Sequence, residues 1–146
     1  MFSRSCEYAL QSILYICLHH KEGRAIGLKE IASSQQVPLH FLSKILQQLV
    51  KGKVLNSMKG PNGGFTLNIP PDELKLIKIV ALIDGQDIFN RCGIGLKQCS
   101  DKTPCPIHFE YNAVKEKIRN LLSEKTLLEL CKEVNQGLSI VTYSEV

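Results

Sequence analysis

The sequence predicts a mainly α-helical fold: a winged helix-turn-helix DNA-binding domain with a small β-hairpin wing and a C-terminal dimerisation helix. Three observations indicate this fold class. Two short amphipathic segments flank a tight turn, two short alternating runs around a Gly-rich turn follow them, and further amphipathic segments fill the C-terminal part. We expect residues 1–84 to form the DNA-binding domain, 85–104 a cysteine-containing cluster-binding loop, and 105–146 the dimerisation helix with a short last helix.

The helix-turn-helix depends on three predicted helices. The first covers residues 6–20, where apolar side chains occupy most faces of a helix. The second spans 28–34 and the third 39–50, which starts just after Pro38 because proline suits the first turn of a helix. Gly52 is a typical stop signal for the third helix. The second and third helices, with the tight turn between them, therefore have helix-turn-helix anatomy.

A β-hairpin is predicted directly after these helices. Residues 54–58 and 65–69 alternate around the Gly-rich turn at 59–64, and Lys59 at its tip is expected to reach phosphates or a minor groove. The stretch 31–71 contains no Asp or Glu but holds Lys44, Lys51, Lys53 and Lys59. Positive charge without any acidic residue favours a polyanionic partner, although a solvated face that lacks acids would account for the pattern equally well.

The C-terminal part is predicted to contain three more helices. One opens at Pro70–Pro71 and ends near residue 84, a second covers 105–122 and a short one 126–134, with an irregular loop at 86–104. The second carries an apolar stripe made of Val114, Ile118, Leu121 and Leu122. That stripe could belong to the intramolecular core, but we favour a homodimer contact because the winged helix already has its own apolar faces.

From the bulk properties we expect a cytoplasmic protein. The formal net charge is +4, and no stretch approaches the ~20 apolar residues that a membrane span needs. The N-terminal residues do not resemble a signal peptide, since no small-residue cleavage site follows the first apolar run. We therefore expect no membrane partner, and cysteines that are reduced or bound to metal.

Three of the six cysteines fall in one loop, in the pattern Cys92-x6-Cys99-x5-Cys105-x2-His108. Closely spaced soft ligands in a Gly-containing segment are what a metal or cluster site requires. Structural zinc held by three cysteines and a histidine, a disulfide-forming redox switch and inert thiols are the alternatives. The remaining cysteines, Cys6, Cys17 and Cys131, lie on apolar helical stripes and are predicted to be buried.

An enzymatic centre at Cys105 and His108 is the least favoured interpretation. A pair spaced by three residues lacks an orienting third group, and the sequence shows no oxyanion site. The sequence therefore predicts a protein that is not an enzyme.

The segments 37–49 and 59–65, together with Gly52 and the early Tyr8-Ala9-Leu10, resemble the Rrf2 family of bacterial winged-helix regulators. The resemblance implies a homodimer bound to a double-stranded DNA operator, with the recognition helix in the major groove and the wing in the minor groove. Carried onto this sequence, the DNA contacts would be His40, Phe41, Ser43, Lys44, Gln47, Lys59, Gly60, Pro61, Asn62 and Gly63.

In the cluster-binding branch of that family, three loop cysteines ligate an iron–sulfur cluster, and Cys92, Cys99 and Cys105 match them. The resemblance implies His108 as the fourth ligand of a 2Fe–2S cluster, which we favour. The alternative fourth ligand is a carboxylate early in the first helix of the other subunit, a place that Glu7 occupies, and 4Fe–4S is the alternative cluster. The first spacing, x6, is one residue longer than the pattern of that branch.

The expected function is a transcription regulator that senses iron–sulfur status, redox state or nitric oxide through this cluster. Binding a cluster would order the loop and change the spacing of the two recognition helices. The alternative is a repressor without a cluster, controlled by a thiol switch or by a regulatory partner protein.

Overall fold

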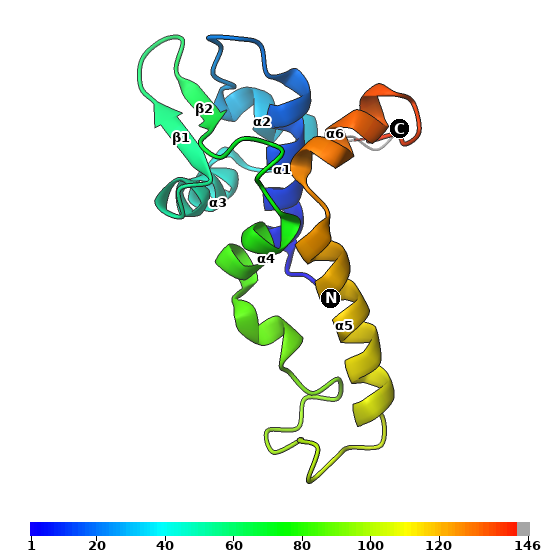
Figure 1. Cartoon of the computed structure of the whole chain (residues 1–146). Coiled ribbons are helices and arrows are strands. Elements are labelled where there is room, and N and C mark those ends of the chain that lie inside the picture. Colours follow the sequence, from blue (N-terminus) through cyan, green and yellow to red (C-terminus); the bar gives the residue numbers. More distant parts are fainter. Residues whose placement is uncertain (143–146) are drawn as a thin grey trace.

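The computed structural model describes residues 1–142, so the last four residues of the predicted segment 105–146 lie outside the described residues. It confirms a mainly α-helical winged-helix architecture. The elements are α1 (Arg4–His19), α2 (Leu28–Gln35), α3 (Leu39–Lys51), β1 (Leu55–Met58), β2 (Gly64–Leu67), α4 (Leu76–Asp84), the 3₁₀-helix η1 (Gln86–Phe89), α5 (His108–Glu124) and α6 (Leu127–Asn135). Figure 1 shows α1–α4 and the β-hairpin grouped together, with α5 extending away from them.

The helix-turn-helix is formed by α2 and α3. The turn between them is closed by Gln36, which adopts a left-handed conformation (φ 53°) and donates its backbone N–H to the carbonyls at the end of α2. One face of α3 packs into the main core through Leu42, Ile45, Leu46 and Leu49, which are at most 3% exposed. The opposite face of α3 is left free for solvent or a partner.

The wing is an antiparallel hairpin in which Leu55 pairs with Leu67 and Met58 with Gly64. Its second strand is also tied to the segment before α2, because Ile26 and Phe65 exchange two backbone hydrogen bonds of 3.0 and 2.8 Å. Gly64 has φ +150°, and a Cβ placed there would lie 2.3 Å from the carbonyl oxygen of Ile26. Only glycine allows the wing to approach this segment so closely.

Three predicted boundaries are wrong, each for a local reason. The helix expected to open at Pro70–Pro71 begins at Leu76, because Glu73 and Leu74 both donate to the Pro70 carbonyl and close a separate turn. The loop expected at 86–104 begins with η1, whose Phe89 is buried. The helix expected from residue 105 begins at His108, since each proline that flanks Cys105 disfavours helical backbone at the residue before it.

The C-terminal helices have different environments. Leu127 and Cys131 of α6 are buried in the main core, where α6 packs against α1. Leu122 of α5 joins Cys6, Val80 and Phe89 in a second, smaller cluster. The other end of α5 meets the cysteine loop, which lies at the end of the molecule opposite the β1–β2 hairpin (Figure 1). Within the described part of the chain, no helix is long and apolar enough to cross a membrane.

Candidate nucleic-acid interface and metal centre

The free face of α3 presents the polar side chains that the sequence assigned to DNA. His40, Lys44 and Gln47 are exposed, while Ser43 is partly buried and accepts a hydrogen bond from the Gln47 amide at 3.4 Å. Long cationic and amide side chains at successive turns of one helix face can reach base edges and phosphates in a major groove. The arrangement therefore has the chemistry of a recognition helix.

Phe41 differs from the other residues predicted to contact DNA. Its ring is partly buried and lies edge-on against the ring of Tyr8, with centroids 5.8 Å apart and an interplanar angle of 87°. This contact joins the start of α3 to α1. Phe41 therefore supports the position of α3 through packing.

The tip of the wing is a tight turn from Gly60 to Gly63, closed by a 2.9 Å hydrogen bond between the Gly63 N–H and the Gly60 carbonyl. Lys59, Gly60, Pro61 and Asn62 are exposed and Gly63 is partly buried. A Cβ at Gly63 would lie 2.3 Å from the carbonyl oxygen of Met58, so the turn is too narrow there for a side chain. The wing thus projects one cation, Lys59, on a compact turn.

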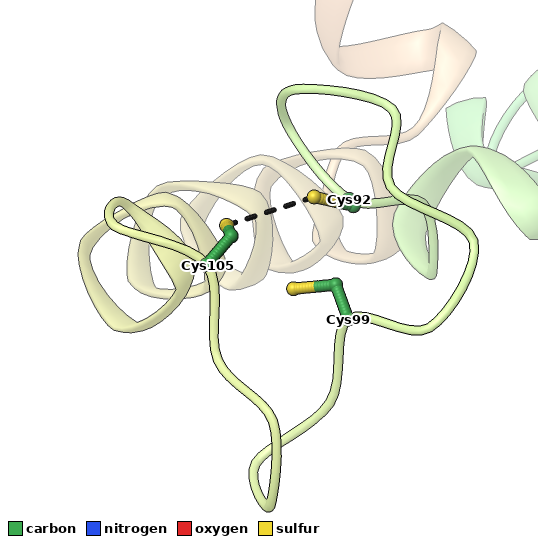
Figure 2. Close-up of side chains that lie close together, drawn as sticks. All are labelled: Cys92, Cys99 and Cys105. Atoms are coloured by element: carbon green, nitrogen blue, oxygen red, sulfur yellow. Dashed lines mark hydrogen bonds between the residues drawn. The ribbon is translucent and has the colours of Figure 1, made fainter.

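The structure brings the three loop cysteines together from positions as far as thirteen residues apart. The Sγ atoms of Cys92, Cys99 and Cys105 all lie within 4.8 Å of one another, and Figure 2 shows the three thiols turned towards a common centre. The Cys92 and Cys105 sulfurs are 3.6 Å apart. Tetrahedral metal–sulfur bonds of about 2.3 Å place ligand sulfurs about 3.8 Å apart, so the group is spaced for a thiolate-bound metal.

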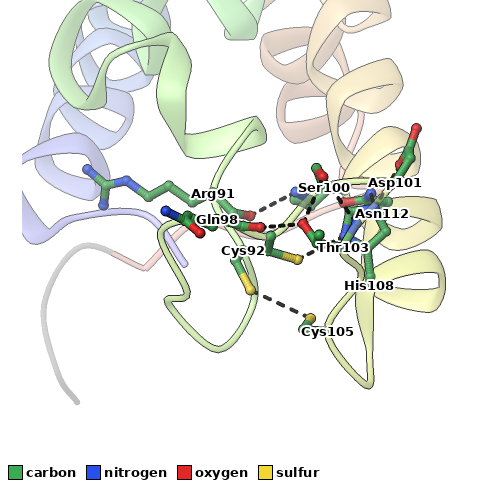
Figure 3. Close-up of polar contacts among 11 residues, drawn as sticks. Arg91, Cys92, Gln98, Ser100, Asp101, Thr103, Cys105, His108 and Asn112 are labelled. Carbon is green, nitrogen blue, oxygen red and sulfur yellow. Dashed lines mark hydrogen bonds and ion pairs between the residues drawn. The ribbon is translucent and has the colours of Figure 1, made fainter.

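His108 lies beside this group as the first residue of α5. Its Nδ1 is 3.0 Å from the Cys99 sulfur, and the residue is only 9% exposed. On the other side of the ring, Nε2 is 2.8 Å from Asp101 Oδ1 and 3.1 Å from the amide nitrogen of Asn112 (Figure 3). One ring nitrogen therefore faces the Cys99 sulfur while the other faces polar partners.

The surroundings of Cys92 and Cys99 shift the pKa values of their thiols in opposite directions. Burial opposes ionisation of Cys92, but the backbone N–H groups of Ile94 and Leu96 and the neighbouring thiols stabilise its thiolate, so its pKa falls to about 7. A backbone hydrogen bond from Cys105 stabilises the Cys99 thiolate, yet burial and the two neighbouring thiols outweigh it and raise the pKa of Cys99. Cys92 is therefore the thiol poised to ionise near neutral pH.

The other cysteines and Glu7 lie away from this group. Cys6 and Cys131 are buried as predicted, and Cys17 is partly buried. Burial, together with the charges of Asp84 and Glu7, raises the pKa of Cys6 to about 12. Glu7 is exposed in the first turn of α1, and neither Glu7 nor His108 belongs to the group of three cysteines whose ligand atoms all lie within 4.8 Å of one another among residues 1–142. Within one subunit, His108 is the predicted fourth ligand that lies beside the cysteines.

Sequence reasoning missed three residues that shape the site. Asn112 lies one helical turn after His108, and this i, i+4 spacing could have revealed it. Asp101 and Lys115 gave no comparable signal. Lys115 is only 7% exposed, and its Nζ donates to the Arg91 carbonyl at 2.8 Å, next to Cys92.

Comparison with known proteins identifies the family of this chain. A family model described as "Rrf2: Iron-dependent Transcriptional regulator" matches residues 2–133. An Aquifex aeolicus protein, whose name assigns it as a helix-turn-helix-type transcriptional regulator, is 30% identical over 132 residues, covering 89% of this chain and 90% of its own length. The transcriptional regulator IscR of Aliivibrio salmonicida is 28% identical over 123 residues, with 84% and 72% covered. The structure of CymR, the global cysteine regulator of B. subtilis, superimposes with a TM-score of 0.76 at 20% identity, covering 90% of this chain and 96% of CymR.

The fold and the exposed polar helix face define a winged-helix DNA-binding protein. This chain belongs to the Rrf2 family of transcriptional regulators. Its relatives are named as regulators and not as enzymes, which confirms the prediction that the protein is not an enzyme.

Proposed function

We propose that this regulator binds its operator as a homodimer and senses iron–sulfur or redox status through a cluster. Cys92, Cys99 and Cys105 would supply three ligands and His108 the fourth, with a 2Fe–2S cluster favoured over 4Fe–4S. The convergence of three sulfurs within 4.8 Å, with an imidazole nitrogen 3.0 Å from one of them, carries the proposal. The sequence relationship to IscR supports it.

The DNA side of the proposal has its own support. His40, Ser43, Lys44 and Gln47 share the free side of α3, and Lys59 to Gly63 form the wing tip. Asp and Glu are absent from the whole stretch 31–71, so no carboxylate in it opposes a phosphate backbone. Binding should therefore weaken steeply as the salt concentration rises.

Homodimer formation is proposed from the outer face of α5. Val114 and Leu121, two turns apart, are 52% and 53% exposed, whereas Leu122 is buried and Ile118 packs against the smaller core cluster. The predicted stripe is thus divided between an inward and an outward side. Apolar side chains left in water at helical spacing favour pairing with a second copy of the same helix.

The cluster is tested by a visible absorption spectrum with iron and sulfide assays on protein purified without oxygen. We expect visible absorbance with both elements present in the parent and lost in Cys92→Ala. Separate His108→Ala and Glu7→Ala variants distinguish the two candidate fourth ligands, because only the true ligand should change the spectrum. A colourless, iron-free parent protein that still binds DNA would refute the cluster.

A regulator without a cluster is the second candidate, and a specific contact favours it. The Cys92 and Cys105 sulfurs are 3.6 Å apart and the pKa of Cys92 is lowered, so the Cys92 thiolate can attack a peroxide and then condense with Cys105. With hydrogen peroxide as the oxidant, Cys92 becomes a sulfenic acid as one water forms, and Cys105 displaces the second water when the disulfide forms, so the two thiols lose two electrons and two protons in all. Control by a regulatory partner protein is the other form of this candidate.

A further inference from the structure

We infer that Asp101 is a positioning residue: its carboxylate fixes the tautomer of His108 so that Nδ1, the nitrogen that faces Cys99, is the one without a hydrogen. The inference deepens the proposed metal or cluster site and names a residue outside the ligand set. It begins from the 2.8 Å contact between Asp101 Oδ1 and His108 Nε2 (Figure 3).

The loop is built to hold Asp101 in this place. Asp101 and Lys102 form the tip of a narrow turn whose two sides, Ser100 and Thr103, exchange backbone hydrogen bonds of 3.3 and 3.0 Å. The Thr103 hydroxyl adds a 2.6 Å bond to the Gln98 carbonyl. This bracing projects the Asp101 side chain over the start of α5, so the contact with His108 does not depend on a freely moving chain.

The hydrogen-bond directions at the ring follow from the contact with the Asp101 carboxylate. Its Oδ1 lies 2.8 Å from Nε2, and a carboxylate oxygen accepts hydrogen bonds. His108 Nε2 must then carry the hydrogen, and a neutral ring has its lone pair on Nδ1. The amide nitrogen of Asn112 lies 3.1 Å from Nε2, and two donors cannot share a hydrogen bond. Turning the amide by 180° exchanges its nitrogen and oxygen, and the oxygen is then a second acceptor for the Nε2 hydrogen.

The result is a carboxylate–histidine pair that faces the Cys99 thiol. Nδ1 is 3.0 Å from the Cys99 sulfur, so the free Cys99 thiol can donate its hydrogen to Nδ1. A bound metal ion would take the place of that hydrogen. A carboxylate that accepts from the outer nitrogen of a ligating histidine fixes the ring orientation and makes the inner nitrogen more basic. Asp101 therefore tunes the fourth ligand without touching the metal.

Two measurements on the full-length chain test the inference. In metal-free, reduced protein, long-range ¹H–¹⁵N correlation spectra report the His108 tautomer directly. We expect the Nε2–H form in the parent and a mixture of tautomers in Asp101→Ala. Since Asp101 is exposed, this variant should fold normally.

The second measurement is Co²⁺ binding, followed by its visible absorption in competition with a chelator. We expect Asp101→Ala to bind Co²⁺ roughly 10-fold to 100-fold more weakly, as other outer partners of metal ligands do. Asp101→Asn keeps an acceptor oxygen and should lose less Co²⁺ affinity than Asp101→Ala. Glu110→Gln is the matched control: it removes one negative charge from the first turn of α5, and no hydrogen bond or ion pair joins Glu110 to the His108 ring in the described structure.

The outcomes separate this inference from the proposed function. An Nδ1–H tautomer in the parent, or equal Co²⁺ affinity in Asp101→Ala and the parent, would overturn the role of Asp101 and leave the cysteine site intact. Equal weakening by Glu110→Gln would also overturn it, because the effect would then be one of net charge. A parent protein that binds neither Co²⁺ nor a cluster would instead refute the proposed site.

Discussion

The Nζ of Lys115 donates a 2.8 Å hydrogen bond to the backbone carbonyl of Arg91, so the middle of α5 holds the residue that immediately precedes Cys92. Lys115 is almost fully buried and also lies 5.3 Å from the centroid of the Tyr111 ring. On the next part of the loop, Gly93 leaves no room for a side chain, since a Cβ there would lie 2.9 Å from the Tyr111 ring. The loop is thus attached to α5 at its beginning, before the chain turns through Cys99.

Replacing Lys115 with methionine should release the start of this loop. The variant keeps an unbranched side chain that is one atom shorter and leaves the Arg91 carbonyl without its charged donor, a loss of about 1.5–3 kcal/mol of stabilisation. We expect trypsin to cut faster at Lys97 and Lys102, by about tenfold, as followed by mass spectrometry. Lys117→Met, on the exposed side of the same helix, is the control, and equal cleavage rates in the two variants would contradict the anchoring role.

Cys92 should be the most reactive thiol of the metal-free protein near neutral pH. Its pKa is lowered to about 7, so its thiolate predominates above that pH, and alkylation by iodoacetamide should fall about tenfold per pH unit below it. Cys131 should react last, because its hydrogen bond with Cys17 and its burial raise its pKa. Peptide mass spectrometry between pH 5.5 and 9 measures both rates, and a Cys92 midpoint above 8.5 would refute the described environment.

The two lysines of the DNA face should behave differently. Lys44→Ala on α3 is expected to change sequence preference, with a cost of about 1–3 kcal/mol at one base pair, if the side chain contacts a base edge. Lys59→Ala at the wing tip should weaken binding to all sequences and reduce the slope of log K against log salt by about 1. Titrations of operator and unrelated DNA at several salt concentrations measure both effects. Lys117→Ala removes the same charge from α5 and should change neither.

The wing should depend on Gly64 more than on Gly60. Alanine at Gly64 would place a Cβ 2.3 Å from the Ile26 carbonyl oxygen and force the backbone apart, whereas alanine at Gly60 meets no atom within 4 Å. Both positions have positive φ, so both variants carry backbone strain, but only Gly64→Ala adds overpacking, which costs about 1–3 kcal/mol. Urea denaturation compares the free energies of unfolding, and equal losses would show that the close approach to Ile26 is unimportant.

The outer face of α5 should control assembly. Val114→Asp combined with Leu121→Asp puts two charges on the exposed apolar side and should convert a dimer to a monomer in sedimentation velocity experiments. Asn120→Asp adds a charge to an exposed polar position of the same helix and is the control. If the double variant sediments like the parent, the dimer contact does not use this face of α5.

The sequence by itself determined the winged-helix class, because hydrophobic periodicity and turn residues are local signals. The apolar stripe of α3, the proline before it and the glycines of the wing each specify their own element, and the structure confirms them. The candidate ligands Cys92, Cys99, Cys105 and His108 were found in the same way, since soft donors at short spacing are visible in one segment.

Tertiary structure decided the contacts between segments. Periodicity shows which face of a helix is apolar, but not what covers that face, so it could not reveal that α6 returns to α1 or that the α5 stripe divides between core and surface. Asp101 and Lys115 likewise show no pattern of their own, and they matter because a braced turn and a buried hydrogen bond place them beside His108 and Arg91. The path of the chain between elements, which depends on packing and backbone hydrogen bonds, supplies this information.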